Sequence, residues 1–192
     1  KILINPSDNK NLLVAVPGPL WSSSKHRGLY ESKDAGKTWN KILYVDENTG
    51  CADIAQSPRD PNIIFASFWQ FRRQPFSFAS GGKGSALYKS VDGGKTWKCM
   101  GLQKTRNIHR IIIDPTNPDI IYAGAIGNPY GVHAERGVYK TTDGGENWKL
   151  ILHTNDSSGV GDMVMDPSNP NKLFVNMWQH NRTPWSFTSG GS

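Results

Sequence analysis

The stretch YKSVDGGKTW, at residues 88–97, decides the fold because close variants of it occur at 30–39 and 139–148. The variants, YESKDAGKTW and YKTTDGGENW, keep an Asp, a Gly and a Trp at fixed spacing. An Asp carboxylate in a tight turn accepts hydrogen bonds from the backbone N–H groups that follow it, and Gly permits the positive φ that such a turn needs. The Trp then offers a large apolar surface that holds the hairpin on its sheet. We therefore predict three structural turns, built by Asp34, Gly36, Trp39, Asp92, Gly94, Trp97, Asp143, Gly145 and Trp148.

Each turn belongs to a longer unit in which two apolar strands flank a turn that contains Pro. These segments are KILINPSDNKNLLVAV (1–16), ADIAQSPRDPNIIFAS (52–67), HRIIIDPTNPDIIYAG (109–124) and GDMVMDPSNPNKLFVN (161–176). The first three are followed by a third strand, the repeated turn and a fourth strand. Four strands in a unit of roughly 50 residues are typical of a β-propeller blade. We predict an all-β fold, a β-propeller segment of four-stranded antiparallel blades, in one incomplete domain, 1–192. Its blades are expected at approximately 1–45, 50–102, 107–153 and, in part, 158–192.

A longer period, which we call the two-blade repeat, relates pairs of blades. The shift that places Trp69 on Trp178 aligns Lys1–Lys83 with Arg110–Ser192 without a gap. The chain then holds about three and a half blades, whereas propellers close with about four to eight. We expect a fragment of a larger propeller whose last sheet, ending at Ser192, has two strands. An open sheet edge and a bare apolar face favour self-association, or stability only together with the missing blades.

Composition narrows the classes of function. The net charge is +6, but the Lys and Arg residues are spread along the chain without a basic run, so we expect no nucleic-acid partner. Cys51 and Cys99 are the only cysteines and are expected to be free thiols. The five His residues lack the spacing of a metal site, and no apolar run is long enough to cross a bilayer. We expect no metal, no cofactor and no membrane span.

The repeated turn resembles the Asp-box, or bacterial neuraminidase repeat, of β-propellers. The wider text, RGVYKTTDGGENWKLIL with DPSNPNKLFV, resembles the sortilin-like bacterial proteins that are usually described as glycosyl hydrolases. The resemblance covers essentially the whole chain and implies a glycosidase-like scaffold. Two motifs of related enzymes are missing, however. The "RIP" motif of sialidases does not occur, and HRGLY (26–30) and ERGVY (135–139) lack the Asp that precedes Gly-Gly-x-Tyr in propeller xyloglucanases.

The candidate binding residues lie in two long loops, 69–82 and 178–191, on the face opposite the repeated turns. Both loops are rich in aromatic and basic side chains. Aromatic rings stack on the C–H faces of sugars, and Arg binds carboxylates or phosphates through paired hydrogen bonds. Alternatively, the loops pack only on themselves. The candidates are Trp69, Gln70, Arg73, Trp178, Gln179 and Arg182.

A charged series begins the first strand of each blade: Lys1, Asp53, Arg110 and Asp162 alternate in sign. We expect these side chains to cluster at the mouth of the channel, either as ion pairs between blades or as a site in which Arg110 binds a ligand. Glycosidases need two carboxyl groups on either side of the scissile bond. The catalytic candidates on this face are Asp53, Asp162 and Glu47, with Asp46 and Asp156 beside them.

Three functions remain open at this point. The first is an extracytoplasmic, secreted or cell-surface glycoside hydrolase, or a carbohydrate-binding relative of one. The second is a sortilin-like module that binds a peptide or protein without catalysis. The third is a structural repeat segment of a surface protein. A carboxylate pair on the long-loop face would favour the first function, and its absence beside an apolar channel wall would favour the second.

Overall fold

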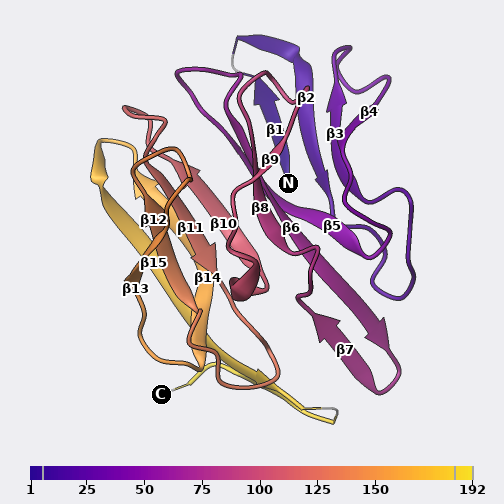
Figure 1. Cartoon of the computed structure of the whole chain (residues 1–192), viewed down its shortest axis with the longest axis vertical. Coiled ribbons are helices and arrows are strands. Elements are labelled where there is room, and N and C mark those ends of the chain that lie inside the picture. Colours follow the sequence, from indigo (N-terminus) through magenta and orange to yellow (C-terminus); the bar gives the residue numbers. More distant parts are fainter. Residues whose placement is uncertain (6, 184, 192) are drawn as a thin grey trace.

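The computed structural model describes residues 1–5, 7–183 and 185–191, and it consists of strands with a single 3₁₀ turn at Gln103–Thr105. The strands form four antiparallel sheets that lie side by side (Figure 1). The predicted all-β propeller segment is confirmed.

The sheets follow one another in chain order. The first contains β1 (Ile2–Asn5), β2 (Asp8–Val16), β3 (Gly28–Ser32) and β4 (Asn40–Leu43). The second contains β5 (Thr49–Gln56), β6 (Ile64–Gln74), β7 (Ser77–Ser80), β8 (Ala86–Ser90) and β9 (Lys98–Cys99). The third contains β10 (Ile108–Ile113), β11 (Ile121–Ala125), β12 (Gly137–Thr141) and β13 (Lys149–Leu152). The fourth contains β14 (Ser158–Asp166), β15 (Asn169–Arg182) and β16 (Phe187–Ser189).

Each of the three repeated turns contains the same pattern of hydrogen bonds. In the β8–β9 turn, Asp92 Oδ1 accepts the Thr96 N–H at 2.9 Å, and Ser90 Oγ accepts the Gly94 N–H at 2.8 Å. Gly94 has φ +91°, a conformation that other residues rarely adopt. A hydrogen bond from the Thr96 hydroxyl is the largest cause that lowers the pKa of Asp92, to about 2. The turns at Asp34 and Asp143 have equivalent bonds.

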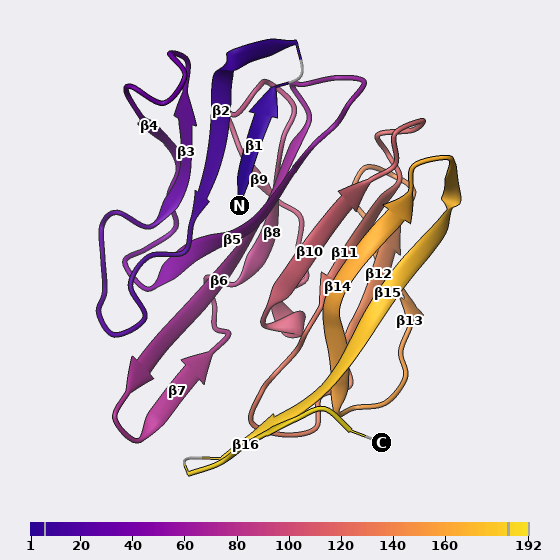
Figure 2. The ribbon, with the colours of Figure 1, turned by 180° about the vertical axis from the view of Figure 1, so that it is seen from behind.

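These turns lie at one end of the sheets and the long hairpins at the other. The Ala35 N–H donates to the Lys10 carbonyl, which joins the β3–β4 turn to the start of β2. In the other two repeated turns, the Gly93 and Gly144 N–H groups donate to the carbonyls of Asn62 and Asp119, in the loops between the first two strands of their own sheets. Figures 1 and 2 show the β3–β4 turn at the top and the β6–β7 and β15–β16 hairpins at the bottom. The repeated turns are therefore remote from the long hairpins.

The two long loops are strands rather than irregular loops, which corrects the sequence-based description. β6 is 11 residues long and extends beyond the part that pairs with β8. β7 pairs with this extension, so the second sheet has five strands. The prediction that the last sheet has two strands was also wrong, because β16 pairs with the end of β15. In both hairpins apolar and polar residues alternate along the chain, and this alternation favours a pair of strands over an irregular loop. Ser192 lies outside the described residues.

The core consists of apolar clusters between adjacent sheets. Between the first two sheets lie Leu13, Leu29, Cys51, Ile54 and Phe68, among others. The cluster between the third and fourth sheets occupies the positions that the two-blade repeat predicts, with Tyr122, Val138, Val160 and Met163. Phe65 and Leu87 of the second sheet join Ile111, Ile121 and Tyr139 of the third in another cluster. The two-blade repeat is therefore a repeat of packing as well as of sequence.

The expected charged arc is present along the inner strands, but Asp53 and Asp162 lie in the middle of β5 and β14 rather than at their starts, which corrects the sequence-based placement. Lys1 Nζ lies 2.9 Å from Asp53 Oδ1, Arg110 lies 3.9 Å from Asp53, and Arg110 lies 2.6 Å from Asp162. Asp53 is buried and also accepts the Ile111 N–H at 2.7 Å. The prediction of direct pairing is confirmed. These contacts join all four sheets through one chain of alternating charges.

Candidate functional site

The two long hairpins and the loop between β11 and β12 enclose an apolar cleft of about 170 Å³. We call it the hairpin cleft. It lies away from the repeated turns, at the end of the molecule where the sequence places the candidate site. Its lining consists of Trp69, Phe78, Ser80, Asn107, Ile126, Gly127, Pro129, Trp178, His180, Arg182 and Phe187.

Two Trp side chains, one from each hairpin, are held in matching positions. The Trp69 Nε1–H donates to Ser80 Oγ at 3.0 Å, and the Trp178 Nε1–H donates to Ser189 Oγ at 3.1 Å. In each case the partner Ser lies on the returning strand of the same hairpin. These bonds satisfy the polar edge of each indole, so its apolar face remains available to the cleft.

Further aromatic contacts fix both indoles. Trp69 stacks on Phe71 at 4.3 Å between ring centroids and meets Phe78 edge-on at 5.9 Å. Trp178 stacks on His180 at 4.7 Å and meets Phe187 edge-on at 5.8 Å. Such pairs restrict the rotation of the rings, which reduces the entropy lost when a ligand binds.

Arg182 joins the two hairpins. Its guanidinium lies 5.8 Å from the Phe78 ring of the first hairpin and 5.6 Å from the Phe187 ring of the second. Its backbone N–H donates to the Pro129 carbonyl at 2.7 Å, which ties β15 to the loop that floors the cleft. The cleft therefore contains a cation held among aromatic faces.

Not every candidate from the sequence lines the cleft. Gln70 Oε1 accepts the Gly84 N–H at 3.1 Å, and Gln179 packs against Gly191 at the same point of the second hairpin. Arg73 lies over Trp21 of the β2–β3 loop, 5.6 Å from its ring. Arg110 belongs to the charged arc. The cleft therefore brings together Trp69, Trp178 and Arg182, and the other four candidates lie elsewhere.

The candidate carboxylates also lie outside the cleft lining. Asp53 is buried between two cations, and Arg110 lowers the pKa of Asp162 through a hydrogen bond. The Glu47 carbonyl accepts the Ser24 N–H at 2.8 Å, and Asp156 faces His153 at 3.1 Å. Within the described part of the chain, no Asp or Glu lines the cleft. In the same residues there is no cluster of three or more His, Cys, Asp or Glu side chains that could hold a metal ion.

Two buried arginines hold the loops between strands together, Arg136 beside the cleft and Arg27 at the equivalent place in the first sheet, and sequence analysis assigned them no role. The Arg136 guanidinium donates to the carbonyls of Asn128, Gly131 and Ser157. Arg27, one repeat earlier, donates to the carbonyls of Pro17, Pro19 and Ser22. Burial is the main cause that lowers the pKa of both. The two-blade repeat aligns these arginines, and this match was the signal that could have revealed them.

Arg136 also acts on His180. Its Nη1 lies 3.2 Å from His180 Nδ1, and burial, followed by the charge of Arg136, lowers the pKa of His180 below the ordinary 6.5. The neutral imidazole that stacks on Trp178 is thereby favoured. Phe71 takes this position in the first hairpin, where the Arg27 guanidinium lies 4.3 Å from its ring.

We expect acid to destabilise the protein partly through His180. A lowered folded-state pKa means that stability is complete above the unfolded value, near 6.5, and is lost as the pH falls below it. His180→Phe copies Phe71 and should flatten the fall in melting temperature between pH 7 and pH 5. His133, whose pKa is also lowered, should leave a residual slope. An unchanged pH profile in His180→Phe would contradict this assignment.

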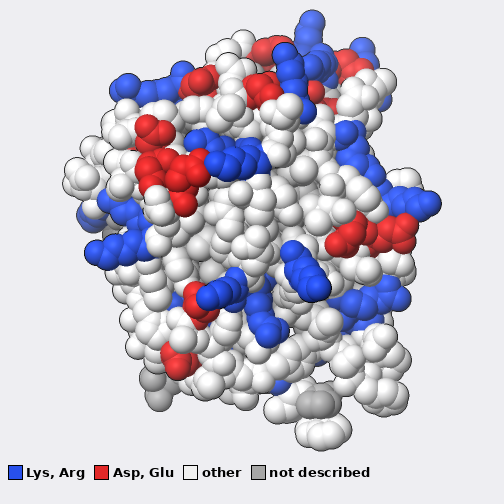
Figure 3. Space-filling model, in the orientation of Figure 1, with Lys and Arg blue, Asp and Glu red and all other residues white. Residues whose placement is uncertain are grey.

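Other hollows are larger but less suited to recognition of a small ligand. One of about 560 Å³ lies on the outer face of β14 and β15, and one of about 500 Å³ lies beside Arg106 and His133. Both are wide open, whereas the hairpin cleft is narrower and has aromatic walls. On the face shown in Figure 3, Lys and Arg are dispersed among Asp and Glu, and no single basic patch stands out. In the described residues no helix is long and apolar enough to span a bilayer.

Solved structures similar to this one include enzymes of glycoside hydrolase family 74 (GH74). The structure matches an ancestral GH74 enzyme with a TM-score of 0.64 at 19% identity, covering 98% of this chain and 25% of that one. It matches the GH74 xyloglucanase from Xanthomonas campestris with a TM-score of 0.63 at 16% identity, covering 94% and 27%. These matches show that the chain has the fold of a β-propeller segment and spans about a quarter of each of those proteins.

The sequence comparisons agree and also name a family. The Sortilin-Vps10 family (sortilin, neurotensin receptor 3) matches residues 27–158, more than half of the chain, and the chain belongs to this family. A xyloglucanase of Paenibacillus sp is 23% identical over the whole chain, which spans 20% of that enzyme. A xyloglucanase of Hypocrea jecorina (strain QM6a) is 26% identical over 65% of the chain, which covers 14% of that enzyme.

Proposed function

We propose that the hairpin cleft binds carbohydrate, as part of a glycoside hydrolase-like propeller. The observation that carries the proposal is the convergence of Trp69 and Trp178, from hairpins of two different sheets, on one cleft. Flat indole faces held by neighbouring side chains provide apolar surfaces on which the C–H face of a sugar ring can stack. The similarity to xyloglucanases makes a xyloglucan oligosaccharide the first ligand to test.

The polar groups of the cleft suit a sugar. Asn107 lines the cleft, and its Oδ1 is buried and accepts no hydrogen bond within the described part of the chain. A buried acceptor of this kind favours a ligand that donates a hydroxyl. At about 170 Å³ the cleft is smaller than the usual pocket for a drug-sized ligand, so we expect it to hold one ring or chain end.

We propose binding rather than hydrolysis at this cleft. A glycosidase generally places two carboxyl groups about 5–9.5 Å apart around the scissile bond. The cleft lining offers no Asp or Glu from the described residues. A polysaccharide ligand further favours a location outside the cytoplasm, which we include in the proposal.

Calorimetric titration of the protein with a xyloglucan oligosaccharide tests the proposal. We expect saturable binding, and Trp69→Ala and Trp178→Ala should each weaken it roughly tenfold or more, because each removes one stacking face. Phe76→Ala is the matched control, since this ring is exposed at the tip of the first hairpin and does not line the cleft. Wild-type protein that binds no oligosaccharide, but binds a peptide through the same Trp residues, would favour the sortilin-like alternative and contradict the proposal.

A further inference from the structure

The hairpin cleft contains a positive charge that no described residue neutralises. Arg182 is the only Lys, Arg, Asp or Glu that lines it within the described part of the chain. The contacts of its guanidinium are with the rings of Phe78 and Phe187, and it pairs with no described carboxylate or carbonyl. A guanidinium carries five N–H donors, and aromatic faces attract its charge without accepting those hydrogens as an oxygen would. The donors of Arg182 are therefore available to a ligand.

Arginines elsewhere in the chain show how the protein can satisfy a guanidinium by itself. Arg110 pairs with Asp53 and Asp162 on the inner strands. Arg136, beside the cleft, donates to three backbone carbonyls. Arg182 is half-buried between the two hairpins without an oxygen partner of either kind. Such an arrangement favours a ligand that brings the acceptor, because the planar guanidinium matches a carboxylate through two parallel hydrogen bonds.

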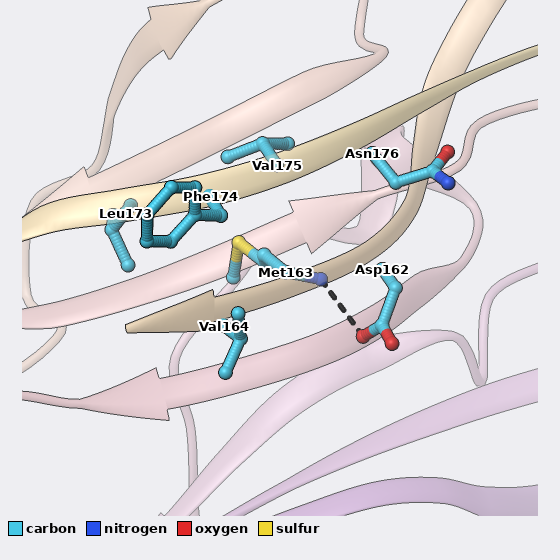
Figure 4. A pocket seen from close by; sticks show the side chains of 7 residues that line it. All are labelled: Asp162, Met163, Val164, Leu173, Phe174, Val175 and Asn176. Atoms are coloured by element: carbon cyan, nitrogen blue, oxygen red, sulfur yellow. Dashed lines mark hydrogen bonds between the residues drawn. The ribbon is translucent and has the colours of Figure 1, made fainter. Parts of the chain in front are cut away.

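The walls of the cleft come from three sheets. Trp69 lies in the second sheet, Pro129 in a loop of the third and Trp178 in the fourth. The larger hollow in Figure 4, in contrast, is lined by β14 and β15 alone. The hairpin cleft is the better defined of the two, so its lining can be matched to the chemistry of a ligand.

The hollow next to the cleft adds positive charge. Asn107 lines the cleft, and Arg106, the residue before it, lines the neighbouring hollow of about 500 Å³ together with Lys104. Neither cation forms an ion pair with a described residue. Glu135, the one acid among the described lining residues of that hollow, accepts the Tyr139 hydroxyl at 2.7 Å. The potential near the cleft is therefore positive, which favours an anionic ligand.

A neutral sugar and an acidic sugar differ in how they meet this lining. Either can stack on the indoles of Trp69 and Trp178 and donate a hydroxyl hydrogen bond to Asn107 Oδ1. A neutral ring that fills the cleft takes water away from the guanidinium and leaves its charge uncompensated, which is unfavourable in apolar surroundings. A ring with a carboxylate accepts two charge-assisted hydrogen bonds from the guanidinium, and these are stronger than bonds to a neutral acceptor.

We propose that the ligand of the hairpin cleft is an acidic oligosaccharide, and that Arg182 binds the carboxylate of a uronic acid ring. Sugar binding itself is the function proposed above, on which this assignment rests, and the carboxylate adds the class of sugar. Neutral xyloglucan units then occupy the cleft more weakly than a uronic acid does.

Calorimetric titration with matched pairs of oligosaccharides tests the proposal. Each pair consists of a short oligomer of galacturonate, glucuronate or mannuronate and its methyl ester, which keeps the ring and removes the charge. We expect at least one uronate to bind about tenfold or more tightly than its ester, because the ester loses the charge-assisted hydrogen bonds. Arg182→Gln should reduce this ratio to about one, because the amide keeps polarity but not the charge or the paired donors.

Arg73→Gln is the matched control. Arg73 takes the equivalent position in the first hairpin, over Trp21 and outside the cleft lining, so its loss changes the net charge by the same amount. This variant should keep the wild-type preference for the uronate. If it loses the preference as fully as Arg182→Gln does, general positive charge selects the ligand and the assignment to Arg182 is wrong.

The outcomes separate this proposal from sugar binding in general. Uronates that bind no more tightly than their esters, or more weakly than a neutral xyloglucan oligosaccharide, overturn the acidic class but leave carbohydrate binding intact. A preference that persists in Arg182→Gln overturns the role of Arg182. Binding of no oligosaccharide overturns both proposals, and so does a peptide that binds through Arg182 by its free C-terminal carboxylate when no oligosaccharide binds.

Discussion

Arg136→Ala should destabilise the protein by roughly 3–5 kcal/mol, because removal of the guanidinium leaves several buried carbonyls without a donor. Arg136 is fully buried and donates to three carbonyls in two loops beneath the hairpin cleft. Neither loop has a regular strand at these points, so few backbone bonds can replace the lost ones. Urea unfolding followed by tryptophan fluorescence measures the loss.

Arg59→Ala provides the comparison for this prediction. Arg59 is exposed and donates to one carbonyl, that of Pro115, at 3.1 Å. Its removal should cost about 1 kcal/mol or less, because water can take its place. Equal losses in Arg136→Ala and Arg59→Ala would show that burial of the guanidinium does not matter, contrary to this account.

Asp53→Ala should also destabilise the protein strongly, by roughly 3–5 kcal/mol, because it removes the buried carboxylate and leaves the cations that paired with it. The change leaves the Ile111 N–H without its acceptor and leaves Lys1 and Arg110 without a shared partner. Together with Asp53, these groups belong to three different sheets, so the loss should appear as less cooperative thermal unfolding as well as a lower melting temperature.

Asp162→Ala is the matched control, because Asp162 occupies the same repeat position and binds the same Arg110. Its side chain is mostly exposed, and exposed ion pairs contribute about 0–1 kcal/mol. We expect the two variants to differ by several-fold in their effect on the free energy of unfolding. Similar losses would mean that the charged arc stabilises through its net charge and not through burial.

The sequence predicted the fold well because its signals are local and repeated. The Asp, Gly and Trp of each repeated turn lie close together in the chain, so their geometry depends little on the rest of the protein. The charged arc was also predicted, since equivalent positions in a propeller lie on neighbouring inner strands. In both cases, residues at equivalent positions of the sequence repeat occupy equivalent positions in the structure, so the period predicts where they lie.

The cleft could be predicted only in part. Trp69, Trp178 and Arg182 were identified from their chemistry, but Phe78, Asn107 and His180 were not. These three come from separate segments, and their approach depends on how far β6 and β15 continue beyond their sheets. The buried role of Arg136 was missed for a similar reason, since its carbonyl partners lie in loops without a sequence pattern.

A crystal structure of the protein soaked with a xyloglucan oligosaccharide tests the central claim most directly. The account predicts a sugar ring in the hairpin cleft, stacked on Trp69 or Trp178, with a hydroxyl donated to Asn107 Oδ1. An empty cleft in crystals that bind the oligosaccharide elsewhere, for example along the charged arc at Asp53 and Arg110, would contradict it.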